Sequence, residues 1–387
     1  MNEDVHVSRG GQALTPADAD ATAQSRQLVD RIVEHIDAEG GWMPFDRFMQ
    51  YALYEPGLGY YAATPGKIGP RGDFITAPEI SPLFARALAT QVAQAFEQVP
   101  PRLLEFGAGS GALAAGLIDA LQRLGAPPER YGIVEVSADL KAEQQARLRE
   151  EAVQWLDAPP DAFDGVIVAN EVLDVMPVKL FLARGGQTLE RGVQAERGQL
   201  GWGERPAGLE LLEAVARIRD EVGPLPDGYV SEVGLVARAW VATLGQWLRR
   251  GVALLIDYGF PRHEYYHPQR AMGTLMCHFR HRAHDDPLWL PGLNDITAHV
   301  DFTAMAQAAR GAGLELLGYT SQARFLLDCG LLELLREAPA GASASAAAWR
   351  LLSEAEMGEL LKVLAFGRGV RGPLRGFASG DRSHRLL

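Results

Sequence analysis

Cysteine is scarce in this sequence, with only Cys277 and Cys329 among 387 residues. Two cysteines cannot form a disulfide framework or a cysteine-rich zinc site, and their scarcity is typical of a reducing compartment. Long apolar runs are also missing, since no stretch approaches the roughly eighteen apolar residues that indicate a membrane span. Residues 1–20 lack the apolar segment of a secretory signal. We therefore expect a protein that is neither secreted nor membrane-spanning.

Basic residues are outnumbered: 37 Lys and Arg stand against 49 Asp and Glu, which gives a net charge of −12. An acidic chain without a concentrated basic stripe is poorly suited to a phosphate backbone, so we expect no nucleic-acid partner. The one basic stretch is the C-terminal tail, which we interpret as a solvated or partner-contacting end. Its arginines are Arg368, Arg371, Arg375, Arg382 and Arg385.

From residue 102 onward, short apolar runs alternate with amphipathic helical patterns. The expected strands are 102–106, 131–136, 165–169 and 252–256, and the helices between them include 113–121, 138–150 and 234–250. This alternation predicts an α/β, Rossmann-like fold whose mostly parallel sheet carries helices on both faces. The length requires one large domain with an insertion, or two domains.

The rest of the chain is arranged around this core. We expect a disordered tail (1–21), an N-terminal helical cap with a long loop (22–100), the α/β core (101–320) and a C-terminal helical extension with the basic tail (321–387). Residues 178–232 interrupt the core as an inserted antiparallel hairpin region. The loop at 55–81 is much longer than the usual connection of about 4–6 residues, which favours a functional role.

The clearest local signal is a strand that runs directly into a glycine-rich turn and a helix, at residues 103–113. Such a turn lets a ligand approach the backbone closely, and the helix directs its free N–H groups toward that ligand. The residues expected to contact it are Glu105, Gly107, Ala108, Gly109 and Gly111.

Two cofactor classes use such a turn. Dinucleotide folds require G-x-G-x-x-G/A, which Gly107, Gly109 and Ala112 satisfy, whereas adenosylmethionine-dependent methyltransferases combine a strand acid with G-x-G-x-G. A carboxylate at Glu105 suits an ammonium group and would repel a pyrophosphate, so the pattern favours S-adenosylmethionine. A glycine-rich turn without any ligand remains a third interpretation.

The next strands supply candidates for the adenosine half of the cofactor. Glu135 ends the second strand and is placed to accept both ribose hydroxyls, with Val136 beside it. Trp155 is predicted to stack on the adenine, although an indole at such a position is equally typical of a core.

Several long motifs together resemble the MidA-like family, which includes a mitochondrial complex I assembly-factor methyltransferase and its bacterial relatives. They are GDFITAPEISPLF (72–84), LLEFGAGSGALA (103–114), IVEVSADL (133–140), ANEVLDVMPV (169–178), IDYGFPRHEYYHPQR (256–270) and TAHVDF (297–302). The resemblance implies a class I methyltransferase fold that uses S-adenosylmethionine. The mitochondrial member is a protein arginine methyltransferase, so a protein substrate, and specifically a respiratory complex I subunit, is implied as the partner.

The resemblance also bears on the covering loop and on localisation. Gly72, Asp73 and Thr76 could by themselves form an Asx-turn and a helix N-cap, but the resemblance implies that they contact the cofactor. Residues 1–21 are acidic and carry one arginine, unlike a mitochondrial transit peptide. We therefore expect a bacterial, cytoplasmic member of the family.

Candidate catalytic residues follow the third expected strand. Asn170, Glu171 and Asp174 lie at the carboxyl edge of the sheet, where ligands of open α/β sheets bind. Glu171 and Asp174 are three residues apart, on one face of a helical turn, and could hold a guanidinium bidentately. The alternative is that Asn170 or Asp174 caps the next helix.

A His- and Tyr-rich segment follows the fourth expected strand and predicts the substrate pocket. The residues expected to line it are Tyr258, His263, Tyr266, His267 and His299. The spacing of His278, His281 and His284 suggests a metal only weakly, and methyl transfer needs no Lewis acid, so we expect no metal. Two rival functions are a nicotinamide oxidoreductase, for which no Tyr-x3-Lys pair is found, and a non-catalytic assembly factor that binds the cofactor.

Overall fold

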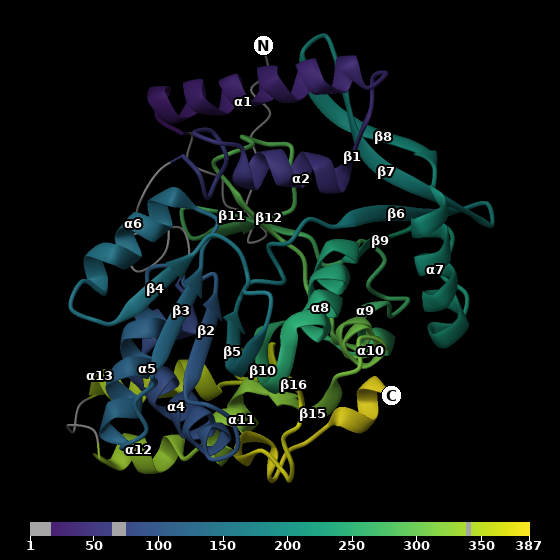
Figure 1. Ribbon diagram of the computed structural model, residues 1–387. Helices are drawn as coiled ribbons and strands as arrows, with labels where there is room; N and C mark the ends of the chain where they lie inside the picture. The colour runs from purple at the N-terminus through teal and green to yellow at the C-terminus, as the bar shows by residue number, and fades with distance from the viewer. Residues whose placement is uncertain (1–16, 64–74, 338–341) are drawn as a thin grey trace.

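The computed structural model describes residues 17–63, 75–337 and 342–387. Figure 1 shows a large core sheet with helices on both faces, and above it a second layer formed by the N-terminal helices and a smaller sheet. Among the described residues, no helix is both long and apolar enough to cross a membrane.

The core sheet has eight strands, ordered β15-β16-β10-β5-β2-β3-β4, with β14 beside β10. Neighbours among β2, β3, β4, β5 and β10 are parallel, and β16 is antiparallel to both β10 and β15. This arrangement confirms the α/β, Rossmann-like fold with a mostly parallel sheet. The strands are β2 (Arg102–Phe106), β3 (Arg130–Val134), β4 (Val153–Leu156), β5 (Phe163–Asn170), β10 (Leu248–Phe260), β14 (Val300–Asp301), β15 (Glu315–Ser321) and β16 (Leu361–Arg368).

Two apolar clusters fill the space between this sheet and its helices, because the strand residues are buried on both faces. The first cluster packs against α4 (Pro82–Phe96), α5 (Ala112–Arg123), α11 (Gln322–Asp328), α12 (Leu331–Glu337) and α13 (Ala342–Leu352). The second packs against α8 (Leu235–Trp247) and α10 (Phe302–Gly311). The helix α6 (Ala138–Arg147) follows β3, as the alternating pattern predicts.

The second layer joins the N-terminus to the segment expected as an insertion. Its antiparallel sheet contains β6 (Lys179–Arg184), β7 (Gln187–Glu196), β8 (Gln199–Pro206) and β9 (Tyr229–Val233), and α7 (Leu209–Val222) packs on it. The short β1 (Met43–Pro44), between α1 (Ala19–Ala38) and α2 (Phe45–Tyr54), pairs with β7. The N-terminal helices are therefore tied to residues that lie about 150 positions later in the chain.

A third, small sheet lies in the region that the sequence pattern left irregular. It consists of β12 (Arg282–His284), β11 (Met276–Phe279) and β13 (Asp295–Thr297), and a short helix, α9 (Arg262–Tyr265), precedes it. Alternate residues of β11 and β13 face opposite ways. Cys277 and Ile296 are fully buried in the apolar cluster of α1 and α2. The opposite face of this small sheet therefore points toward the core sheet.

Two expectations about the extent of the terminal regions need correction. Residues 321–387 are not simply a helical extension, because β16 lies inside the core sheet between β10 and β15. The apolar run of β16 is too short for the periodicity of apolar residues to distinguish a strand from a helix. At the other end, residues 1–16 lie outside the described residues. The helix α1 begins at Ala19, where Asp18 accepts the N–H of Ala21, so the expectation of disorder is wrong for residues 19–21.

The basic tail is folded onto the body of the protein. Arg368 donates to the carbonyl oxygens of Leu248 and Ala312 at 2.9 and 3.1 Å. Arg382 pairs with Glu359 at 2.6 Å, and Arg385 pairs with Glu264. The tail contains the short 3-10 helices η1 (Arg375–Phe377) and η2 (Ser383–Leu386). The interpretation as a solvated or partner-contacting end is therefore wrong for Arg368, whereas Arg385 keeps an exposed side chain.

Candidate active site

A cavity of about 1030 Å³ lies between the carboxyl edge of the core sheet and the layer formed by α2 and the β11–β13 sheet. One side of it, the glycine wall, consists of residues 105–110 and 135–137. Another side, the acidic wall, consists of Asn170, Glu171, Asp174 and Asp295. The cavity brings together side chains from the core, the N-terminal helices and the small sheet.

The glycine wall depends on a backbone shape that other residues rarely adopt. Gly107, Gly109 and Gly111 all have positive φ angles, of 61°, 54° and 80°. A Cβ on Gly107 would lie 3.0 Å from a methyl group of Val172. Gly107, Ala108 and Gly109 line the cavity. Gly111 instead sits behind the turn as the N-cap of α5, packed toward Leu148 and Gln144.

Both predicted carboxylates of the glycine wall line the cavity. Glu105 is 2% exposed and accepts the hydroxyl of Tyr131 at 2.5 Å, and burial raises its pKa to about 7. Glu135 accepts the N–H of Ser137 at 3.0 Å and the amide of Gln144 at 2.8 Å, and burial raises its pKa as well. Val136 lines the cavity beside them with 82% exposure.

Gln144 on α6 was not predicted, and it organises this wall. Its buried amide donates both to Glu135 and to the carbonyl oxygen of Gly109, at 2.8 and 2.9 Å. It also accepts the indole N–H of Trp155 at 3.0 Å. Trp155 packs against the core cluster, and the structure does not bring it to the cavity, which residues 157–159 line at that position.

The covering loop reaches the cavity through the short helix α3 (Ala77–Ile80). Thr76, at its N-cap, lines the cavity, whereas Gly72 and Asp73 lie outside the described residues. Glu79 in α3 accepts a hydrogen bond from the hydroxyl of Ser110 and one from Arg147 at 3.0 Å. These contacts fasten α3 to the glycine turn.

The acidic wall begins where β5 ends. Asn170, Glu171 and Asp174 all line the cavity, but the segment that carries them is a non-helical turn. Glu171 has a left-handed φ of 54°. The expected helical turn is therefore wrong, and so is a capping role for Asn170 or Asp174 in a following helix. The carboxylate of Asp257, on β10, shapes this turn by accepting the N–H groups of Val172 and Leu173 at 3.1 and 2.8 Å.

Burial and nearby like charges both disfavour the ionised form of the carboxylates in the acidic wall. Burial, followed by repulsion from Asp257, raises the pKa of Glu171 to about 8 and the pKa of Asp174 well above its ordinary value. One side-chain oxygen of Asn170 and one of Asp174 are buried without a hydrogen-bond partner among the described residues. The wall is thus suited to a cationic group that carries N–H donors.

Aromatic side chains flank the acidic wall, and two of them were not predicted. Tyr54 and Tyr61 stack with their ring centroids 5.7 Å apart, and the hydroxyl of Tyr61 donates to Asp295 at 2.8 Å. Asp295 also lies outside the predicted set. In the structure, the period-two alternation of β11 and β13 places Met276, His278, Asp295 and Thr297 on the cavity side.

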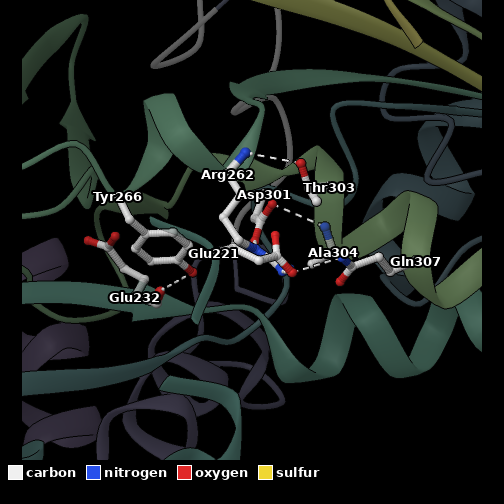
Figure 2. A network of polar contacts seen from close by, with 8 residues as sticks. All are labelled: Glu221, Glu232, Arg262, Tyr266, Asp301, Thr303, Ala304 and Gln307. Atoms are coloured by element: carbon white, nitrogen blue, oxygen red, sulfur yellow. Dashed lines mark hydrogen bonds and ion pairs between the residues drawn. The ribbon is translucent and has the colours of Figure 1, made fainter. Parts of the chain in front are cut away.

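The predicted substrate pocket is brought together only in part. Tyr258 and His299 line the cavity and stack at 6.3 Å. His263 and His267 are exposed on and after α9, away from the cavity lining. Tyr266 is buried, and its hydroxyl donates to the carbonyl oxygen of Glu232 at 3.0 Å, as Figure 2 shows. The expectation for these three residues is therefore wrong.

The polar network in Figure 2 explains why α9 turns away from the cavity. Arg262 is buried and pairs with Asp301 at 3.0 Å and with Glu221 at 2.5 Å, which fastens α9 to β14 and α7. Within the described residues, no group of three His, Cys, Asp or Glu side chains is arranged to hold a metal ion. Of the three spaced histidines, His278 lines the cavity, whereas His284 is buried beside Asn294.

Comparisons with known proteins agree with this geometry. Residues 85–320 match the family model described as putative S-adenosyl-L-methionine-dependent methyltransferase. A solved Burkholderia thailandensis protein bound to S-adenosyl-homocysteine is 49% identical, with a TM-score of 0.92 over 96% of this chain and 100% of that one. "Protein arginine methyltransferase NDUFAF7, mitochondrial" of Mus musculus is 29% identical over 73% of this chain and 70% of its own length. The Drosophila melanogaster homologue of that protein is 27% identical to this chain, over 93% of this chain and 88% of its own length.

The glycine wall fits S-adenosylmethionine. Glu135 would accept the ribose hydroxyls, and Glu105 and the unpartnered oxygen of Asn170 would accept from the ammonium group. The turn at Gly107 leaves room that a Cβ would fill. The family match and the S-adenosyl-homocysteine bound to the solved relative decide for a methyltransferase over a nicotinamide oxidoreductase, and S-adenosylmethionine is the cofactor. The chain belongs to the MidA-like family of S-adenosylmethionine-dependent methyltransferases.

Proposed function

We propose that this methyltransferase acts on an arginine side chain of a protein substrate. The observation that carries the proposal is the acidic wall, where the half-buried Glu171 and the buried Asp174 line the same cavity. The strongest charge effects that other described residues exert on these two groups come from further carboxylates, Asp257 and Asp295. A bound guanidinium would offset this repulsion, because it carries a positive charge and five N–H donors.

The same residues suit the chemistry of a guanidinium nucleophile. A guanidinium is protonated at neutral pH and its lone pairs are delocalised, so it attacks poorly unless its charge is drawn toward the far nitrogens. Glu171 and Asp174 would hold those nitrogens, while Tyr54 and Tyr258 flank the aliphatic stem. The bound cofactor supplies the methyl group, and the transfer releases one proton from the attacked nitrogen. Holding the two reacting groups in near-attack geometry can contribute roughly 7–11 kcal/mol.

The identity of the substrate protein rests on the relatives. Those from mouse and fly are named mitochondrial protein arginine methyltransferases. This supports a protein acceptor here, and we propose a subunit of a respiratory complex I and a cytoplasmic site of action. Asn170, Glu171 and Asp174 are the proposed catalytic residues, with Tyr258 and His299 as substrate contacts.

Incubation of a deletion-strain lysate with the purified chain and methyl-labelled S-adenosylmethionine tests the proposal. We expect label in one protein, recovered as methylarginine after hydrolysis, and none with Gly109→Val. Label on another amino acid would contradict the arginine assignment. Cofactor binding without any label transfer would favour the non-catalytic assembly factor.

A further inference from the structure

Asp257 is a buried carboxylate that the proposed reaction does not use directly. It lies on β10, is 1% exposed and does not belong to the cavity lining. One of its oxygens accepts the N–H groups of Val172 and Leu173 at 3.1 and 2.8 Å, and the other accepts the N–H of Tyr258 at 2.8 Å. Both carboxylate oxygens of Asp257 therefore accept hydrogen bonds from the backbone around the acidic wall.

The turn it holds has an unusual shape. Glu171 adopts a left-handed φ of 54°, which non-glycine residues rarely take without support from their surroundings. Its N–H donates to the carbonyl oxygen of Ile256 at 2.8 Å, next to Asp257. The start and the middle of the turn are thus fixed by neighbouring residues of β10, and the N–H of Ala298 donates to the carbonyl oxygen of Asp174 at 2.9 Å. Held in this shape, Glu171 and Asp174 line the cavity.

We propose that Asp257 is a positioning residue, which holds the 171–174 turn in the shape that presents Glu171 and Asp174 to the target cation and places a third carboxylate directly behind them. The inference rests on the proposed function in taking these two carboxylates as the cation site. Asp257 itself touches neither cofactor nor substrate.

The charges around the turn support the second half of this role. For both Glu171 and Asp174, Asp257 is the largest cause of a raised pKa after burial, and Asp295 from β13 adds to it. The two wall carboxylates also repel each other, and Tyr258 on β10 faces all three acids. Burial raises the pKa of Asp257 itself to about 7, so its charge is present near pH 8, where Glu171 ionises. Removing that charge should therefore let Glu171 and Asp174 ionise at lower pH.

Glu232, on β9, provides a matched control. It is also 1% exposed, and one of its oxygens accepts two successive backbone N–H groups, those of Thr274 and Leu275, both at 2.9 Å. It does not belong to the cavity lining. Glu232→Gln therefore measures what it costs to neutralise a buried carboxylate that holds a turn, without changing the charge behind the acidic wall.

The test compares Asp257→Asn with Glu232→Gln in the full-length protein. We expect Asp257→Asn to lower the transfer rate to the labelled acceptor on the order of tenfold, with cofactor affinity nearly unchanged. Its rate should also rise with pH about one unit earlier than in the parent. Glu232→Gln should leave that pH midpoint in place. Asp257→Glu keeps the charge but displaces the carboxylate. In this variant the transfer rate should fall, while the pH midpoint of the rate should stay in place.

A second readout needs no substrate. Titration of ¹³C-labelled side-chain carboxyls by NMR, with Glu171→Gln used to assign the Glu171 signal, should show this signal titrating at lower pH in Asp257→Asn. An unchanged midpoint in this titration would overturn the proposal, even if no acceptor protein were found. If Glu171→Gln abolished transfer while Asp257→Asn kept the parental rate and pH profile, the positioning role would be wrong and the proposed function would stand.

Discussion

The two walls of the cavity are built in different ways. The glycine wall comes mainly from one continuous segment, β2 and the turn before α5, with the end of β3 beside it. The acidic wall gathers residues from the end of β5 and from β13, and Asp257 of β10 holds it from behind. Recognition of the cofactor is thus largely local in sequence, whereas recognition of the target depends on how distant segments pack.

The walls also differ in how their charges are satisfied. Glu105 has the hydroxyl of Tyr131, and Glu135 has the N–H of Ser137 and the amide of Gln144. In the acidic wall, Glu171 accepts the amide of Asn170 at 3.0 Å, but the carboxylates repel one another, and one oxygen each of Asn170 and Asp174 has no partner among the described residues. The carboxylates of the glycine wall thus have partners within the protein, whereas the acidic wall keeps unpartnered oxygens among the described residues, as the proposed cationic target requires.

The largest effect should come from filling the glycine wall. Gly109→Val would place a branched side chain on a residue with a φ of 54° that lines the cavity, so we expect no measurable cofactor binding in calorimetry. Gly125→Val is the matched control, because Gly125 has a φ of 69° at the other end of α5 and lies in open space. Normal binding by Gly109→Val would show that this wall is not the cofactor site.

A smaller effect is expected from Glu135→Ala, which removes the acceptor for two ribose hydroxyls. The loss should be roughly 1.5–3 kcal/mol, or a tenfold to hundredfold weaker affinity for S-adenosylmethionine in calorimetry. Asp139→Ala, on the first turn of α6 and outside the cavity lining, serves as the control. An unchanged dissociation constant would remove Glu135 from the ribose role.

The smallest effect concerns the stability of the protein and its dependence on pH. Burial raises the pKa of Glu171 from 4.5 to about 8, so the folded protein binds this proton more tightly than the unfolded chain does. The associated stabilisation is present below about pH 4.5 and is lost as pH rises toward 8. In cofactor-free protein, Glu171→Gln should therefore gain stability relative to the parent between pH 5 and 8. If the free energy of unfolding by denaturant differed between Glu171→Gln and the parent by the same amount across that range, the raised pKa of Glu171 would be contradicted.

The sequence predicted the glycine wall well because its signal is contiguous. A strand, a glycine turn and a helix within residues 103–113 suffice to place Glu105, Gly107 and Gly109 at one site. Trp155 was misplaced because a short strand presents alternate residues to opposite faces, and its indole points to Gln144.

The acidic wall was only half predicted, for reasons of tertiary structure. The carboxyl edge of β5 correctly placed Glu171 and Asp174 at the cavity, but their spacing suggested a helical turn, and the clamp by Asp257 comes from another strand. His263 and His267 follow the end of β10 closely in sequence, yet the Arg262–Asp301 ion pair turns their segment away. Asp295 lies on a strand of three residues, too short for its alternation to be recognised.

The most direct test of the division between the walls is Glu171→Gln, which keeps the shape of the side chain and deletes its charge. Single-turnover transfer to the labelled acceptor should fall by about 10²-fold or more, with a milder loss in Asp174→Asn. Cofactor affinity in calorimetry should stay nearly parental in both variants, as should the transfer rate of the buried control Glu232→Gln. Parental transfer rates in both acidic-wall variants, or a loss of cofactor affinity that matches the loss of rate, would contradict the account.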